Sequence, residues 1–359
     1  MVLRSMSLLL LLGCSAINAA EPAVHYPDHS QLLIIRDAGG KGRPVTTPAD
    51  WAVRVAHIRA NMELVMGPLP DASLRVPLAV ETVSEERTAK YLRRKIRFTP
   101  EPDDRVPAWL LIPHDLPASK KSAAMLCLHQ TNGALGKDEP AGLGGLKSLH
   151  YAHELAERGY VCLVPDYPSF GEYPYDFKTK GQHFASGSMK AIWNNIRAVD
   201  LLASLPQVDD QRLGVIGHSL GGHNSLFTAV FDERLKAVVS SCGFTPFHDY
   251  YGGKVAGWTS DRYMPRIRDV YENNPDKIPF DFYEILGALA PRGFYSNSPV
   301  NDSNFDVGGV RKAFSKADGV YRLFHASGQL VLATPEAPHD FPEAQRKAAY
   351  EWLDGQLRK

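Results

Sequence analysis

The stretch LGVIGHSLGG at residues 213–222 decides the predicted fold. It starts as a short apolar run, which is typical of a buried strand, and it leads into a helical pattern over residues 224–230. Between the two lies Gly217-His218-Ser219-Leu220-Gly221, which fits G-x-S-x-G. In a strand–turn–helix setting this pattern forms a nucleophile elbow, because the flanking glycines let the backbones of a sharp turn approach closely. We therefore predict that Ser219 is a nucleophile rather than a bystander in a glycine-rich turn.

The elements around this stretch alternate between strands and helices. Three antiparallel strands come first, and apolar strands separated by helices follow. The predicted strands are residues 78–84, 91–98, 106–112, 124–128, 160–164, 213–217, 235–239, 292–296 and 329–332, and the predicted helices are 151–158, 192–205, 224–230 and 341–357. Strands that are apolar throughout indicate a parallel sheet covered by helices on both faces. The predicted class is α/β, with a mostly parallel central sheet and antiparallel N-terminal strands.

The first twenty residues have the order of a secretory signal peptide. Arg4 precedes an apolar run at residues 8–12, small residues follow, and the run is too short to span a membrane. Cleavage is expected near residue 20, which predicts a secreted or periplasmic protein. The alternative is a lipoprotein leader, because Leu11-Leu12-Gly13-Cys14 resembles a lipoprotein cleavage box. In that case Cys14 is lipidated and the protein is anchored to a membrane.

Two further segments complete the predicted domain organisation. Residues 21–77 are expected to hold a linker and an N-terminal helix that begins at Thr47-Pro48, with Thr as N-cap. Residues 78–359 form the predicted catalytic domain, with an insertion at about 244–284. Aromatic and other large side chains of the insertion either cap the active-site pocket or pack the insertion onto the domain; they are Trp258, Tyr263, Met264 and Tyr271.

A serine nucleophile needs a base within hydrogen-bond reach, and the base needs an orienting acid. His339 lies between the last predicted strand and the C-terminal helix, at the carboxyl edge of the sheet, so we predict that it is the base. Asp302 and Asp306 both follow the predicted strand at residues 292–296. Asp302 is closer to the strand end and is the favoured acid, with Asp306 as the alternative.

Two backbone amides are expected to form an oxyanion hole. One is the amide of Leu220, directly after the nucleophile, at the start of a helix. The second donor comes from the loop after the strand at residues 124–128, and it is the amide of Thr131 or of Gln130.

Composition excludes several other classes of function. The chain has 359 residues with 40 basic and 40 acidic side chains, so no excess of positive charge indicates a nucleic-acid surface. Cys127, Cys162 and Cys242 are expected to be buried thiols, with a Cys127–Cys162 bridge left open. His150 and His153 are three residues apart but lack a third ligand, so neither a metal site nor a cofactor is predicted.

These motifs resemble the dienelactone hydrolase and acetyl xylan esterase branch of the α/β-hydrolases, over most of residues 78–359. The resemblance rests on Leu128-His129-Gln130, Pro165-Asp166-Tyr167, Phe170-Gly171, Gly217-His218-Ser219-Leu220-Gly221-Gly222, Leu289-Ala290-Pro291-Arg292 and Pro338-His339-Asp340. It implies Ser219, Asp302 and His339 as a catalytic triad. The chain departs from this branch in three ways: the nucleophile is Ser where dienelactone hydrolases have Cys, His129-Gln130 replaces the usual His-Gly, and residues 244–284 form a long insertion before the strand at residues 292–296.

The expected activity is cleavage of carboxylic esters by an exported serine hydrolase, with a small-molecule or carbohydrate ester as substrate, for example an acetylated sugar. Two rival hypotheses stay open. One is a serine peptidase of the prolyl-oligopeptidase type, which shares this catalytic domain. The other is a non-catalytic binding protein that has kept the fold.

Overall fold

The structure is a computed structural model that describes residues 23–116, 121–179 and 183–358. The predicted leader and Cys14 lie outside these residues. None of the helices within the described ranges has both the length and the apolar character that a membrane span requires.

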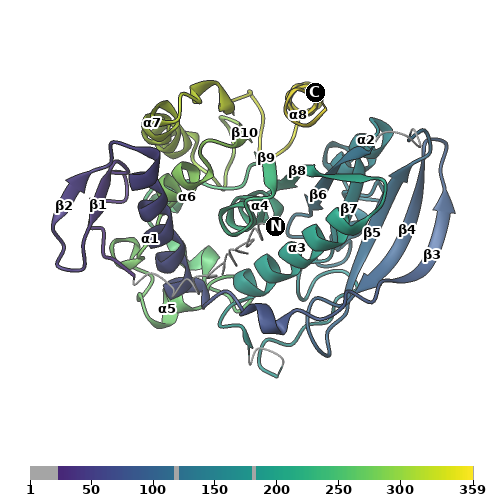
Figure 1. Cartoon of the computed structure of the whole chain (residues 1–359), viewed down its shortest axis with the longest axis horizontal. Coiled ribbons are helices and arrows are strands. Elements are labelled where there is room, and N and C mark those ends of the chain that lie inside the picture. Colours follow the sequence, from purple (N-terminus) through teal and green to yellow (C-terminus); the bar gives the residue numbers. More distant parts are fainter. Residues whose placement is uncertain (1–22, 117–120, 180–182, 359) are drawn as a thin grey trace, which may run out of the picture.

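Within the described residues, nine strands form one sheet in the order β11-β10-β9-β8-β6-β7-β5-β4-β3 (Figure 1). The strands are β3 (Glu81–Arg87), β4 (Tyr91–Phe98), β5 (Val106–Pro113), β6 (Ser122–Leu128), β7 (Val161–Pro165), β8 (Val208–His218), β9 (Leu235–Ser241), β10 (Gly293–Asn297) and β11 (Leu330–Ala333). From β7 to β11 all neighbours pair in parallel, whereas β3, β4 and β5 pair antiparallel. The predicted α/β class, with a mostly parallel sheet and antiparallel N-terminal strands, is confirmed.

Helices cover both faces of the sheet (Figure 1). Successive side chains of a strand point to opposite faces, so Ala124 and Leu126 of β6 pack into one core whereas Met125 and Cys127 pack into another. The first core is covered by α3 (Gly187–Ser204), α4 (Leu220–Phe231), α6 (Phe282–Leu289) and α7 (Val307–Leu323), and the second by α2 (Tyr151–Glu157) and α8 (Glu343–Leu357).

The N-terminal segment packs onto the domain, which differs from the expected linker. A small antiparallel hairpin, β1 (Ile34–Arg36) and β2 (Gly42–Pro44), precedes α1 (Pro48–Met66). Leu32, Ile35 and Val45 are buried in the first core. Strands of three residues are too short to show a hydrophobic period, which is why the pattern was missed. The helix itself begins as predicted, with Thr47 and Asp50 forming a capping box.

The predicted insertion lies between β9 and α6 and holds little regular structure. It contains the short helix α5 (Arg266–Asp269) and the 3-10 turns Tyr250–Gly252, Val255–Trp258 and Pro275–Lys277. Other 3-10 turns are Ala72–Leu74, Gly136–Asp138, Lys147–Leu149 and Ser327–Gln329. Aromatic packing holds the insertion in place: the Trp258 ring lies 5.8 Å from Phe247 and 5.5 Å from Phe282, between ring centroids.

The three cysteines of the described residues, Cys127, Cys162 and Cys242, are all buried and free, as expected for structural thiols. The open alternative of a Cys127–Cys162 bridge is therefore not realised. Burial, together with the neighbouring Cys162 thiol, raises the pKa of the Cys127 thiol well above its usual value.

Candidate active site

Ser219 stands at a sharp turn between β8 and α4, with φ 53° and ψ −115°. A non-glycine residue persists in such a conformation only where its surroundings enforce it. Glycines on both sides permit the turn: a Cβ at Gly217 would lie 2.2 Å from the Gly221 carbonyl oxygen, and one at Gly221 would lie 1.9 Å from that of Leu128. The Ser219 N–H donates to the Ser241 carbonyl at 2.8 Å, which ties the turn to the end of β9.

Asp302 and His339 meet at the same edge of the sheet. His339 Nδ1 lies 2.9 Å from each carboxylate oxygen of Asp302, and the amides of Asn304 and Phe305 donate to that carboxylate at 2.8 and 3.2 Å. Burial raises the pKa of Asp302, but the hydrogen bond and charge interaction with His339, together with the two amides, outweigh it and hold the pKa below its usual value. The carboxylate therefore stays ionised at neutral pH and orients the imidazole.

Asp306, the alternative acid, has a different position. It is the N-cap of α7, where its Oδ1 accepts from the Gly309 amide at 2.7 Å. The structure brings Asp302, and not Asp306, into contact with His339.

His339 also lies beside the residue that precedes the nucleophile. The His218 and His339 rings contact edge to face, with 4.9 Å between centroids. Burial and then the neighbouring His339 lower the pKa of His218 to about 3, so His218 is neutral, and its Nδ1 bonds to the Ser241 hydroxyl at 3.0 Å. The chain segments of Ser219, Asp302 and His339 thus meet at one place.

A cavity of about 140 Å³ opens beside Ser219. Leu220 and Thr131, two of the predicted oxyanion residues, line it with the serine. In the described part of the chain neither of their backbone amides has a hydrogen-bond acceptor. Gln130 is not among the lining residues, and its side chain donates to Glu139 at 2.8 Å. Of the two candidate second donors, Thr131 lines the cavity and Gln130 does not.

The rest of the cavity wall is uncharged and largely aromatic. Besides the three residues above, it consists of His223, Tyr250, Gly257, Trp258, Tyr263, Asn304 and Phe305. Of the four insertion residues singled out in the sequence, Trp258 and Tyr263 line the cavity, Met264 is buried in the core, and Tyr271 packs half-buried against it. The Tyr263 hydroxyl lies 3.0 Å from Thr131 Oγ1, which joins the insertion to the oxyanion loop.

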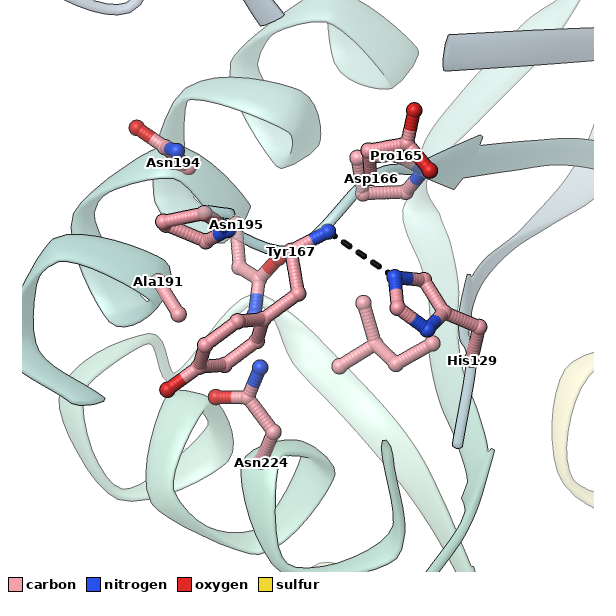
Figure 2. A pocket seen from close by; sticks show the side chains of 10 residues that line it. His129, Pro165, Asp166, Tyr167, Ala191, Asn194, Asn195 and Asn224 are labelled. Carbon is pink, nitrogen blue, oxygen red and sulfur yellow. Dashed lines mark hydrogen bonds between the residues drawn. The ribbon is translucent and has the colours of Figure 1, made fainter. Parts of the chain in front are cut away.

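The loop that follows β6, residues 129–133, holds the candidate oxyanion donors and is called the oxyanion loop. Figure 2 shows a hydrogen bond between His129 of this loop and Tyr167. His129 Nε2 accepts from the Tyr167 amide at 2.9 Å, so Nδ1 carries the proton and donates to the Gln130 carbonyl at 2.6 Å. A void of about 10 Å³ beside these residues has room for about one water molecule. Next to it, the fully buried Lys137 ammonium pairs with Asp166 at 2.9 Å.

Comparisons with known proteins agree with this architecture. Residues 148–284 match the model of the prolyl oligopeptidase family. A glucuronoyl esterase from Solibacter usitatus has the same fold, with a TM-score of 0.69 at 19% identity over 93% of this chain and 98% of that one. The chain has the α/β-hydrolase fold.

Two relatives similar in sequence extend the comparison. YtaP of Bacillus subtilis is 26% identical over 281 residues, 74% of this chain and 87% of that protein. Carbohydrate esterase MZ0003, from an unknown prokaryotic organism, is 27% identical over 198 residues, 48% of this chain and 43% of that protein. The chain thus spans less than half the length of the carbohydrate esterase. The chain is similar to carbohydrate esterases in both sequence and fold.

One group of side chains in the described part of the α/β-hydrolase has the spacing of a metal site. The ligand atoms of Cys242, Asp302 and His339 lie within 4.8 Å of one another. Two of the three form the hydrogen-bonded pair described above, and the Cys242 thiol donates to the Asp340 carbonyl at 3.3 Å. The cluster is therefore accounted for by the candidate acid and base, and it assigns no separate metal site.

Proposed function

We propose that this α/β-hydrolase is a serine esterase that cleaves carboxylic esters of carbohydrates, with acetyl esters of sugars among its substrates. The observation that carries the proposal is the Asp302–His339 hydrogen bond, which lies next to the cavity lined by Ser219. An acid, an imidazole and a serine on a strained turn are the parts that two-step acyl transfer requires.

In the proposed mechanism His339 Nε2 takes the proton of Ser219 as the hydroxyl attacks the ester carbonyl. The amides of Leu220 and Thr131 donate to the resulting oxyanion. His339 then protonates the leaving alcohol and activates a water molecule, which releases the acid and restores Ser219. Asp302 holds the imidazole in the required tautomer and stabilises its charged form.

The carbohydrate part of the proposal is supported by the relatives and by the cavity. The similar proteins are named as a carbohydrate esterase and a glucuronoyl esterase. Aromatic side chains in the wall, such as Trp258 and Tyr263, offer apolar faces with polar edges, which suit a ring that carries hydroxyl groups. The predicted leader supports action outside the cytoplasm, as a secreted, periplasmic or lipid-anchored enzyme.

A serine peptidase is the second candidate, because residues 148–284 match the prolyl oligopeptidase family. Purified protein is assayed with acetylated xylo-oligosaccharides and with proline-containing peptides. The esterase proposal expects turnover of the first set and none of the second, and the opposite result would favour the peptidase.

The nucleophile is tested with Ser219→Ala. This variant should lose 4-nitrophenyl acetate hydrolysis by a factor on the order of 10⁵ or more, because the acyl intermediate cannot form. Ser204→Ala, at the exposed end of α3, is the matched control and should keep wild-type activity. Labelling by a fluorophosphonate should likewise require Ser219. Turnover retained in Ser219→Ala, or a wild type that is never labelled, would refute the proposal and favour a non-catalytic binding protein.

A further inference from the structure

His223 is a cavity residue that the proposed mechanism does not use. It lies one turn after the nucleophile on α4, where its N–H donates to the Ser219 carbonyl at 3.2 Å. The residue is only 7% exposed, yet it lines the cavity beside Ser219. His223 is therefore a buried residue of the cavity wall, close in the chain to the nucleophile.

The imidazole has unused hydrogen-bonding capacity. Its Nδ1 is enclosed and has no hydrogen-bond partner at ordinary distance among the described residues; the nearby Gly243 carbonyl interacts with the ring only weakly, and Nε2 makes no hydrogen bond to the described residues either. Most buried polar groups are paired, and an unpaired one costs free energy, so this group needs an explanation. The rings around it supply only packing: Trp258, Phe227 and Tyr263 lie 4.8, 5.5 and 6.1 Å away between centroids.

The charge state of this histidine is set by its surroundings. Burial lowers the pKa of His223 to about 3, and the Gly243 backbone carbonyl offsets only part of this effect. The ring is thus neutral at physiological pH. A neutral imidazole has one donor and one acceptor nitrogen, so it can exchange hydrogen bonds with a hydroxyl but offers no charge to a carboxylate.

The remaining wall has the same character. Its polar side chains are hydroxyls and one amide, those of Ser219, Thr131, Tyr250, Tyr263 and Asn304, and none of the cavity-lining residues carries a charge. An uncharged wall cannot pair with a buried carboxylate, whose desolvation would then be uncompensated. The cavity is built for a neutral ligand.

We propose that this cavity is a subsite for an uncharged sugar ring and that His223 exchanges a hydrogen bond with one of its hydroxyl groups. This inference rests on the proposed function and names the substrate class of the same site. His223 is then a specificity residue that positions the ester carbonyl over Ser219.

The role of His223 is tested by comparing two substrates. Acetylated xylo-oligosaccharides carry sugar hydroxyls, whereas 4-nitrophenyl acetate has none to offer. In His223→Phe, which keeps a ring but loses both nitrogens, the ratio of kcat/KM for the sugar ester to that for 4-nitrophenyl acetate should fall about tenfold, the usual size for one lost hydrogen bond. Most of the loss should appear in KM.

Two further variants separate recognition from packing. His223→Gln keeps a donor and an acceptor and should restore most of the ratio. His248→Phe makes the same change at a largely exposed histidine of the insertion and should leave the ratio at the wild-type value. An unchanged ratio in His223→Phe, or a fall that His223→Gln does not reverse, would overturn the proposal.

The uncharged class is tested with acetylated oligogalacturonides, whose rings carry carboxylates. Wild-type kcat/KM should be at least about tenfold lower for these than for acetylated xylo-oligosaccharides, because the carboxylate loses its hydration without gaining a partner. Equal values would overturn the neutral subsite.

The outcomes distinguish this inference from the proposed function. Turnover of 4-nitrophenyl acetate without turnover of any acetylated sugar would overturn the sugar subsite and leave the serine esterase standing. An inactive wild type with Ser219 unlabelled would overturn both.

Discussion

The nucleophile elbow and the insertion beside it are held in place by different kinds of contact. At the elbow the backbone itself is close-packed, so that a Cβ at Gly222 would lie 2.7 Å from Gly243 Cα. In the insertion the contacts are between side chains, such as the Phe247, Trp258 and Phe282 rings. Side-chain packing tolerates exchange of one apolar residue for another, whereas a backbone contact tolerates no added atom. This difference suggests that the rigid elbow fixes the position of the nucleophile Ser219, whereas the insertion, whose side chains line the cavity, determines which substrates bind.

The strongest way to break the elbow is Gly221→Ala. The new Cβ would lie 1.9 Å from the Leu128 carbonyl oxygen, so either the turn or β6 must move. Activity on 4-nitrophenyl acetate should fall on the order of 10⁴-fold or vanish, and the melting temperature should drop. Gly355→Ala in α8, where nothing lies within 4 Å of the new Cβ, is the control and should be slightly stabilising. A Gly221→Ala protein as active as Gly355→Ala would contradict this account.

The second largest loss of activity is expected when the carboxylate that orients His339 is removed. Asp302→Ala should lower kcat about 10³- to 10⁴-fold, because His339 loses the group that fixes its tautomer. Asp306→Ala removes the cap of α7 and should cost about 1 kcal/mol of stability while kcat stays near wild type. Steady-state kinetics with thermal unfolding of both variants decides between the two carboxylates; a larger loss of kcat in Asp306→Ala would reverse the assignment.

A buried carboxyl makes the insertion sensitive to pH. Asp281 caps α6 and accepts from the Phe247 amide at 3.0 Å, which links the two ends of the insertion. Burial raises the pKa of Asp281 to about 7, although the Phe282 and Phe247 amides oppose the shift. The protonated form is favoured in the folded state, so the stability that this group contributes is complete below about pH 4 and is lost as the pH rises through 7.

The variant Asp281→Asn removes this titration and keeps the shape. Relative to it, the wild type should lose on the order of 2–4 kcal/mol of stability between pH 4 and pH 8. Denaturant unfolding at several pH values measures the difference. Asp276→Asn, at an exposed position of the insertion, should show no such trend. A wild type and Asp281→Asn that differ by a constant amount would contradict the shift.

The smallest expected effect on kcat concerns the hydrogen bond that connects the insertion to the loop beside the elbow. The Tyr263–Thr131 hydrogen bond joins the insertion to the oxyanion loop at 3.0 Å. Tyr263→Phe and Thr131→Val should each lower kcat about three- to tenfold, and the double variant should be no worse than either alone. Additive losses in this double-mutant cycle would show that the contact does not position the Thr131 amide.

The elbow could be predicted from the sequence because its constraint is local. Only small residues fit at Gly217 and Gly221, and both belong to one short motif at residues 217–221 that can be recognised in the sequence. The choice of acid could not be settled in the same way, since it depends on which aspartate meets His339, 37 residues further along. A contact between residues so far apart produces no periodic pattern in the sequence, so it cannot be predicted from hydrophobic periodicity.

Other features were missed for separate reasons. The helix α7 carries three glycines, which weaken a helical pattern, although Val310, Phe314 and Ala317 keep the spacing of one buried face. Lys190 reads as a surface residue of α3, but it is fully buried because Asp104 and Glu101 pair with it at 2.6 and 3.0 Å. Charged residues are placed inside only by partners that the tertiary fold brings together.

The N-terminal segment packs onto α6 through a fully buried pair, Arg54 with Glu284, which are 230 residues apart in the chain. During synthesis Arg54 of α1 emerges 230 residues before Glu284, its partner in the ion pair. An unpaired guanidinium is costly to bury, so this end cannot dock early. Docking of α1 on α6 therefore depends on a contact that most of the intervening chain separates in sequence.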